Sequence, residues 1–174
     1  YGGAFYALAD CRQFGLEFGR EPVRRFTDAA DALTQGVKKA VLLSHPDSAD
    51  LAFLYGSILT DGGDGKTSPS INVCVFADRE VDRSPTGSGT AGRIALLHAK
   101  GLIGPNEVLI NESVIGTVMT ARVLHAVRLG ALDARYIAAE PHAGEAVQTT
   151  RVRQPELRER VDDQPFAAAH MGRC

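Results

Sequence analysis

The residues that could best bind a ligand or take part in catalysis lie between Asp82 and Arg93, where the sequence reads DRSPTGSGTAGR. The glycine-rich part precedes a run of helical composition, so the backbone N–H groups of Gly87 to Thr90 are expected to lack intrahelical acceptors. The helix dipole adds partial positive charge at the same end. Together these features favour a site for a carboxylate or a phosphate, and glycine lets a ligand approach the backbone. The alternative is a tight turn that binds nothing.

The sequence favours a nucleotide less than other anions as the ligand of this site. The run lacks the lysine of a P-loop, and its glycines do not match the G-x-G-x-x-G spacing of a dinucleotide-binding turn. Asp82 could pair with an ammonium group on the same ligand whose carboxylate meets Gly87 and Ser88. That combination describes an amino or imino acid. Asp82 could instead cap the turn or pair with Arg83.

The cysteines and histidines indicate neither a disulfide framework nor a metal site. The chain has an odd number of cysteines, without C-x-x-C spacing: Cys11, Cys74 and Cys174. Cys74 stands between two valines, which is typical of a buried apolar residue rather than a nucleophile. No pair of histidines has metal-ligand spacing on one recognisable element, so no metal is expected.

The composition is that of a single globular domain. The chain has 174 residues, of which 44% are hydrophobic and 23% charged. A net charge of -2 and the absence of tryptophan argue against nucleic acid and anionic lipid as partners. The apolar stretches are shorter than the roughly 20 residues of a membrane span. With no signal segment at Tyr1 and no disulfide pattern, we expect a cytoplasmic protein without nucleic-acid or membrane partners.

Two helices and at least five strands are expected to position the DRSPTGSGTAGR run. Pro22 is expected at the first helical position, and apolar residues then recur at three- and four-residue steps over residues 23–41, which predicts a long amphipathic helix. A second helix is expected over residues 88–100, ended by Gly101. Strands are expected at residues 2–9, 51–60, 70–77, 107–110 and 114–123. The first should be buried on both faces, and the second and third should form a hairpin.

The pattern weakens beyond residue 123. Residues 134–138 are strand-like, and the tail after them mixes arginines and carboxylates without an apolar face. We therefore treat residues 124–174 as a divergent C-terminal segment, for which packed and poorly packed structures are equally open.

Four segments together carry a family resemblance: YGGAFYAL, HPDSADLAFLYGSILTDG, NVCVFADREV and DRSPTGSGTAGR. Over residues 1–123 the chain resembles the proline racemase family, and within it the trans-3-hydroxy-L-proline dehydratase branch. The resemblance implies an α+β chain with the diaminopimelate-epimerase-like fold, in which two related α/β domains close on a substrate. Residues 1–123 would be mainly the second domain with part of the interdomain region. It also implies an enzyme that needs no cofactor.

The resemblance assigns roles to five residues. Asp82 would hold the ring nitrogen of an imino acid, and the backbone of Gly87 and Ser88 would hold its carboxylate. Phe76 would form a wall of the ring pocket, although by itself it would be interpreted as a core aromatic. Racemases of the family have a catalytic cysteine where this chain has Thr86, and a threonine hydroxyl is a poor substitute for a thiol of pKa about 8.5. Thr86 is typical of the dehydratase branch, where it would orient the leaving hydroxyl or a water.

The implied reaction starts with a cysteine of the first domain removing the Cα proton of trans-3-hydroxy-L-proline. Loss of the 3-hydroxyl as water would then give Δ1-pyrroline-2-carboxylate. That cysteine belongs in an MCGH-type motif before YGGAFYAL, and none of this chain's cysteines has such a context. The isolated chain is therefore expected to be inactive. A proline or hydroxyproline racemase or epimerase and a non-catalytic amino-acid-binding or interaction module remain alternatives, and a homodimer is left open.

Overall fold

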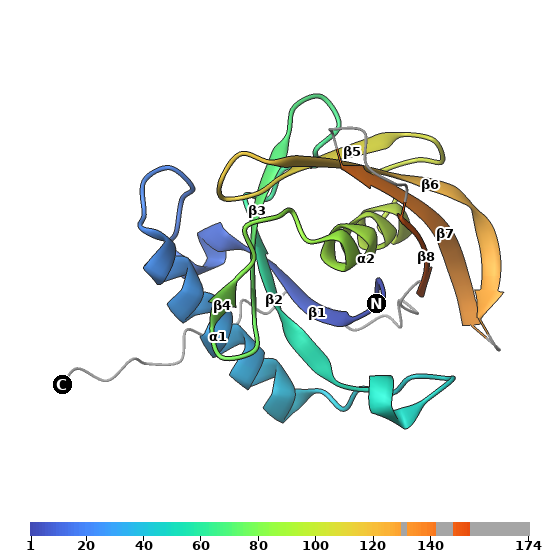
Figure 1. The fold of residues 1–174 in the computed structure, drawn as a ribbon, viewed down its shortest axis with the longest axis horizontal. Coiled ribbons are helices and arrows are strands. Elements are labelled where there is room, and N and C mark those ends of the chain that lie inside the picture. The colour runs from blue at the N-terminus through green and yellow to red at the C-terminus, as the bar shows by residue number, and fades with distance from the viewer. Residues whose placement is uncertain (130–131, 142–147, 154–174) are drawn as a thin grey trace.

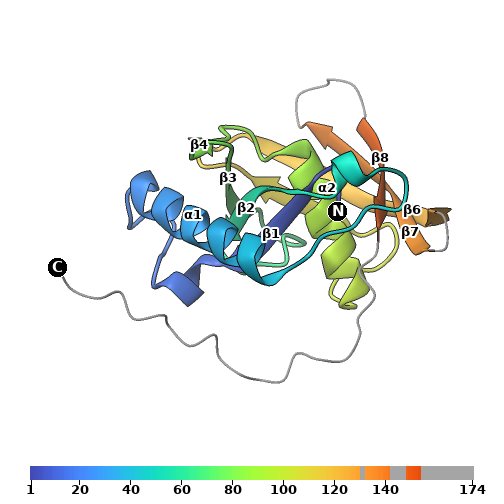
Figure 2. The same cartoon turned by 90° about the horizontal axis from the view of Figure 1, so that it is seen from below.

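The computed structural model of the chain describes residues 1–129, 132–141 and 148–153, and it is α+β in class. A curved sheet wraps around helix α2 (Gly87–Ala99), while helix α1 (Val23–Ala40) lies against the outside of the sheet (Figures 1 and 2). Two short 3-10 helices, η1 (Cys11–Phe14) and η2 (Ala49–Leu51), lie in the connections. Within the described ranges, no helix has both the length and the apolar character needed to cross a membrane.

Eight strands of the described ranges form one sheet. They are β1 (Phe5–Asp10), β2 (Leu54–Thr60), β3 (Ser70–Phe76), β4 (Glu80–Val81), β5 (Val108–Glu112), β6 (Val118–Leu129), β7 (Leu132–Pro141) and β8 (Gln148–Arg153). Their spatial order is β1-β2-β3-β5-β6-β7-β8, with β4 paired to β3. The pairs β1/β2 and β3/β5 are parallel and the others are antiparallel. Because α2 is part of the crossover between the parallel strands β3 and β5, it lies against one face of the sheet.

Strand β3 separates two different environments. Side chains alternate between the two faces of a strand, so neighbouring residues of β3 point to opposite sides. Val73 and Val75 pack with Phe26 of α1 in an apolar cluster. Ser70 and Asn72 point to the other side, where their partners belong to α2 and to the loop before it. Strand β3 therefore has an apolar outer face under α1 and a more polar inner face at the start of α2, whereas the rest of α2 packs in a second apolar cluster on β5, β6 and β7.

Helix α1 has the amphipathic character that its sequence predicts. Its buried residues are Phe26, Thr27 and Ala30, and the ring of Phe26 stacks on Phe18 with 4.5 Å between centroids. Pro22, expected as the first helical residue, is instead the N-cap, one position before the helix begins. Helix α2 is followed by Gly101 at φ +69°, as expected for a C-terminal glycine. The predicted hairpin is also confirmed, since β2 and β3 are antiparallel.

Two expectations about strands are wrong, and one short strand was not expected. Strand β1 is half-buried along its length and lies at the end of the described sheet order, so it is not buried on both faces. The strand expected at residues 114–123 begins at Val118, because Ser113 to Thr117 form a turn in which the two side-chain oxygens lie 2.7 Å apart. It then continues to Leu129. The short strand β4 was not expected.

The described part of the C-terminal segment contains paired strands. Strand β6 crosses residue 123 and pairs with β7, which pairs with β8. The strand-like residues 134–138 lie within β7, whereas β8 was not expected. The predictions for residues 130–131, 142–147 and 154–174 lie outside the described residues.

Candidate active site

Asp82 organises the loop that leads into α2. Its backbone N–H donates to the Cys74 carbonyl oxygen over 3.0 Å, which attaches the loop to β3. One carboxylate oxygen accepts from the Ser84 N–H at 2.8 Å, and the other accepts from Thr86 Oγ1 at 2.7 Å. The turn contact considered for Asp82 is therefore present. The same carboxylate also sets the direction of the Thr86 hydroxyl.

Thr86 is the N-cap of α2 and is 5% exposed. Its backbone has φ +65° and ψ +100°, a region that β-branched residues rarely adopt. The first helical hydrogen bond runs from the Thr90 N–H to the Thr86 carbonyl oxygen over 2.7 Å. Thr90 was expected to have a free N–H, and that expectation is wrong. The N–H groups of Gly87, Ser88 and Gly89 precede this bond, at the positions where a helix leaves donors without intrahelical acceptors.

Close packing accounts for part of the glycine content of the loop. A Cβ on Gly89 would lie 2.4 Å from Ile58 Cδ1 of β2. A Cβ on Gly2 would lie 2.1 Å from the Ser88 carbonyl oxygen, so the start of the chain also fits tightly against α2. These two glycines are explained by the approach of helix and strands, without a ligand.

Tyr6 is a site residue that the sequence interpretation missed. Its hydroxyl lies 3.0 Å from Ser88 Oγ, in the first turn of α2. Its ring meets Tyr55 edge to face at 5.6 Å, and Tyr55 in turn lies 5.4 Å from Phe76. The three rings form a row next to the helix N-terminus. The available signal was an aromatic residue with a hydroxyl in a strand of mostly small residues, which by itself does not identify a partner.

Burial keeps two acidic groups of this region protonated. It raises the pKa of Tyr6 to about 12, with Cys74, Tyr55 and Asp82 raising it further and the Ser88 hydrogen bond lowering it. Burial also raises the pKa of Cys74 to about 12, with Asp82 adding to the effect and a hydrogen bond with Thr86 opposing it. Cys74 is fully buried, as expected, and a thiol that keeps its proton is a poor nucleophile. Tyr6 keeps its proton at neutral pH and can act as a hydrogen-bond donor.

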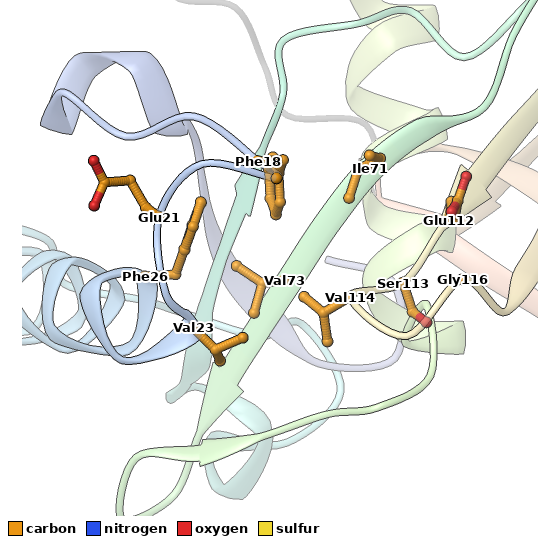
Figure 3. A pocket seen from close by; sticks show the side chains of 11 residues that line it. Phe18, Glu21, Val23, Phe26, Ile71, Val73, Glu112, Ser113, Val114 and Gly116 are labelled. Carbon is orange, nitrogen blue, oxygen red and sulfur yellow. The ribbon is translucent and has the colours of Figure 1, made fainter.

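Two surface pockets flank the sheet near the two ends of β3. One, of about 350 Å³, includes Tyr55 and Phe76 and thus borders the row of rings. The other, of about 270 Å³, contains none of the predicted site residues (Figure 3). Its walls include Phe18, Glu21, Val73, Glu112 and Val114. Among the described residues, no group of His, Cys, Asp and Glu side chains is arranged to hold a metal ion.

The structure thus brings four of the five predicted site residues to one junction. Asp82, Thr86, Gly87 and Ser88 lie together where the loop enters α2. Phe76 joins them indirectly, through its contact with Tyr55 and the contact of Tyr55 with Tyr6. The junction combines a carboxylate, a hydroxyl held by that carboxylate, helix N–H donors and an aromatic border. It has the groups needed to bind a zwitterionic amino or imino acid.

Known proteins are similar to this chain in sequence and in fold. The proline racemase family model matches residues 1–152. The chain is 48% identical over 132 residues to a human trans-3-hydroxy-L-proline dehydratase, which covers 75% of this chain and 37% of that protein. It is 40% identical over 134 residues to a 3-hydroxyproline 2-epimerase of Burkholderia multivorans, covering 77% of this chain and 40% of that protein.

A solved structure gives the same result for the fold. A hydroxyproline epimerase from Agrobacterium vitis with bound trans-4-OH-L-proline matches with a TM-score of 0.73 and 25% identity, over 89% of this chain and 45% of that one. The chain belongs to the proline racemase family. It spans less than half the length of each of these three relatives.

Proposed function

We propose that this chain is part of a trans-3-hydroxy-L-proline dehydratase, a hydro-lyase that forms Δ1-pyrroline-2-carboxylate and water. The observation that carries the proposal is the Asp82–Thr86 hydrogen bond at the N-terminus of α2. A hydroxyl stands there where racemases of the family are expected to carry a second thiol. Animal relatives named trans-3-hydroxyproline dehydratase reach 44–48% identity, which supports the same choice, although bacterial relatives with either name match at 39–40%.

The proposed substrate contacts follow from the charges at the junction. The Asp82 carboxylate faces the ring nitrogen, and although each oxygen already accepts one hydrogen bond, each keeps a further lone pair. The N–H groups of Gly87 and Ser88 receive the substrate carboxylate, assisted by the helix dipole. Phe76 and Tyr55 border the ring. Such a site selects a small imino acid with both charges present.

The proposed reaction needs one base and one acid. A cysteine of the other domain takes the Cα proton, and the electron pair forms the Cα–C3 double bond as the C3–O bond breaks. The leaving oxygen takes a proton and departs as water, and the enamine tautomerises to Δ1-pyrroline-2-carboxylate. In this chain Thr86 orients the leaving hydroxyl, and Tyr6 is a proton-bearing group connected to the helix through Ser88. No cofactor takes part.

The domain arrangement is part of the same proposal. We infer a diaminopimelate-epimerase-like fold in which residues 1–123 form mainly the second of two related α/β domains, with 124–174 as a divergent C-terminal segment. The sheet curved around one central helix supports this (Figure 1). A cytoplasmic location, a homodimer and the absence of nucleic-acid and membrane partners stay predictions.

Turnover of trans-3-hydroxy-L-proline tests the proposal, with the pyrroline product measured. The reading frame that contains this chain and a first domain should form the product, whereas this chain by itself should form none. Product from the isolated chain would place the base within these residues and contradict the proposed division of labour. A folded two-domain protein that binds the imino acid without converting it would favour the non-catalytic alternative.

A further inference from the structure

Thr86 is held in an unfavourable backbone conformation, and something must hold it there. At φ +65° the Cβ of an L-residue crowds its own backbone, and a β-branched side chain makes the crowding worse. Residues in such conformations persist only where the surrounding structure determines them. The residues that impose this conformation also determine where the Thr86 hydroxyl lies.

The Pro85 carbonyl oxygen is the point at which this conformation is fixed. Pro85 is buried, and its oxygen accepts from Thr90 Oγ1 at 3.0 Å and from the side-chain amides of Asn72 and Asn111 at 3.2 Å each. This oxygen lies in the same rigid peptide plane as the Thr86 nitrogen. Turning that plane about the N–Cα bond of Thr86 is the φ rotation itself. Three donors on the Pro85 oxygen therefore fix the φ angle of Thr86.

Of the three donors to the Pro85 oxygen, Asn111 is the one whose side-chain amide is oriented by a further contact, with Arg93. The Arg93 guanidinium donates to Asn111 Oδ1 over 2.8 Å, and arginine has no acceptor. The amide nitrogen of Asn111 must therefore face the other way, where it meets both the Pro85 oxygen and Thr90 Oγ1, the latter at 2.7 Å. Asn111 is fully buried, so water does not replace these contacts.

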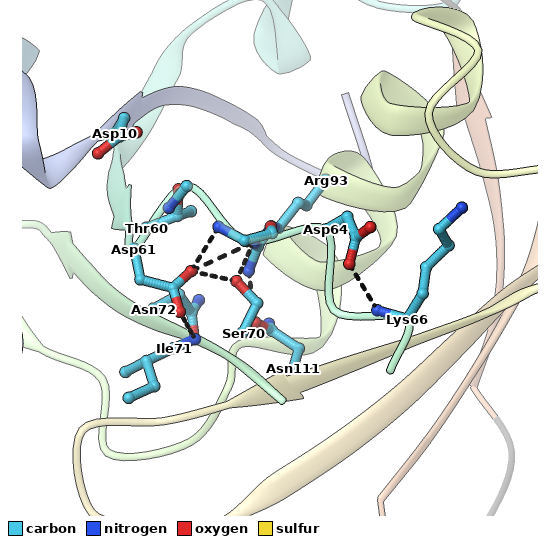
Figure 4. A network of polar contacts seen from close by, with 12 residues as sticks. Asp10, Thr60, Asp61, Asp64, Lys66, Ser70, Ile71, Asn72, Arg93 and Asn111 are labelled. Carbon is cyan, nitrogen blue, oxygen red and sulfur yellow. Dashed lines mark hydrogen bonds and ion pairs between the residues drawn. The ribbon is translucent and has the colours of Figure 1, made fainter. Parts of the chain in front are cut away.

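Arg93 is anchored in turn at the far side of the network (Figure 4). It is 4% exposed, donates to the Gly63 carbonyl oxygen over 2.8 Å and also donates to Ser70 Oγ. The Asp61 carboxylate lies 4.0 Å from it. A continuous line of contacts, part-buried at the turn after β2 and buried from Arg93 and Asn111 onward, thus connects that turn to the peptide bond before Thr86.

We propose that Asn111, oriented by Arg93, is a positioning residue that holds Thr86 in its left-handed conformation through the Pro85 carbonyl. It touches no substrate in this account. Its effect is to place the Thr86 hydroxyl against Asp82 and to set the first turn of α2, where the substrate carboxylate is proposed to bind. The kinetic consequence rests on the proposed function, whereas the conformational consequence does not.

The sharpest variant is Asn111→Asp in the two-domain protein. The side chain keeps its shape and still accepts from Arg93, with which it is complementary in charge, so the fold should be retained. It loses both amide donors, and it attracts the Thr90 hydroxyl away from the Pro85 oxygen. We expect kcat to fall by about 10- to 100-fold, as for a small displacement of a reacting group, and KM to rise by a smaller factor, because the N–H groups proposed to bind the substrate carboxylate shift as well.

Ser70→Ala is the matched control. It removes one anchor of Arg93 but leaves the contacts of Arg93 with Gly63 and Asn111, so Asn111 keeps its orientation. The control should lower the thermal midpoint of unfolding while kcat stays within about twofold of the parent. A loss of kcat equal to that of Asn111→Asp would show that any damage to the network has the same effect, and the proposal would be overturned.

A second measurement is independent of turnover. In a Thr86→Gly background the positive φ carries no steric cost, so loss of Asn111 releases no strain there. Asn111→Asp should therefore lower the thermal midpoint more in that background than in the parent protein, where relaxation of Thr86 offsets part of the lost hydrogen bonding. Equal shifts in the two backgrounds would overturn the proposal. If the parent protein shows no turnover, the proposed function fails while this comparison still decides the role of Asn111.

Discussion

The two faces of β3 are stabilised in different ways. On the α1 side the buried side chains are Cys11, Leu16, Phe26, Ala30, Leu59, Val73 and Val75. On the side that faces the start of α2 they include Ser70, Asn72, Thr90, Arg93 and Asn111, joined by hydrogen bonds. Both groups are buried to a similar degree. They differ in the kind of contact, which is apolar packing in the first group and directional hydrogen bonding in the second.

Apolar packing fixes the distance between layers, but it tolerates exchanges of similar volume. A buried hydrogen-bond network fixes directions as well, because each donor must find its acceptor. In this protein the directional network ends at the peptide bond before Thr86, next to Asp82. The difference teaches that packing on the α1 side of β3 supplies stability alone, whereas the polar network at the start of α2 also supplies geometry for the site, beside an apolar cluster that the rest of α2 forms with β5, β6 and β7.

The largest expected effect on stability is on the α1 side. Phe26→Ala should lower the free energy of unfolding by about 3–5 kcal/mol, because it empties a packed volume between α1 and the sheet. The ring also stacks on Phe18, which would lose its partner. Urea unfolding of the two-domain protein followed by circular dichroism measures the effect, and kcat of the folded fraction should be unchanged. A loss of kcat without a loss of stability would reverse the assignment of the two faces.

Asp82→Asn should have the opposite effect, a large loss of turnover with little change in stability. The amide keeps an oxygen that can accept from Ser84 but loses the charge that would face a substrate ammonium. Turnover should fall by about 100-fold, since a hydrogen bond to a charged group contributes about 1.5–3 kcal/mol. Unfolding should change little. Arg83→Gln, which removes an exposed charge from the next residue, is the matched control, and near-normal kinetics for Asp82→Asn would reduce Asp82 to a turn residue.

A smaller effect is expected from alkaline titration of Cys74. Burial raises its pKa from 9.0 to about 12, so the unfolded chain ionises first as the pH rises. The stability that the protonated thiol contributes is complete below pH 9 and is lost between about pH 9 and 12, with about 1 kcal/mol lost by pH 10. The difference between the unfolding midpoints at pH 8 and pH 10 should therefore be smaller in Cys74→Ala than in the parent protein. An unchanged pH dependence in that variant would assign the loss to other groups.

Some of these features could be predicted from the sequence and others could not. The apolar stripe of α1 and the glycine after α2 are local signals, and both are confirmed. The edge position of β1 depends on which strands pair with it, which its own residues do not encode. Asn72 and Asn111 contact Pro85 from 13 and 26 residues away, and Tyr6 meets Ser88 across 82 residues. Such contacts have no local periodicity and require the fold.

The candidate site divides in the same way. Asp82, Thr86, Gly87 and Ser88 are contiguous enough to be found together in the sequence, and the family resemblance assigned their roles. Tyr6 and Asn111 come from other strands and were found only through their contacts. Thr90 was expected to present a free N–H, but the helix begins early enough to use it.

The central claim is that a site with Thr86 at this position eliminates water and does not invert a stereocentre. Inversion requires one group to remove the Cα proton and a second to deliver one from the opposite face, and a threonine hydroxyl is a poor match for that second group. The two-domain protein should be tested in heavy water, with deuterium at Cα and optical rotation of L-proline followed beside the dehydration of trans-3-hydroxy-L-proline. We expect dehydration without inversion, and some inversion once Thr86→Cys supplies a second thiol. Efficient inversion of L-proline by the protein with Thr86 would contradict the account and establish a racemase.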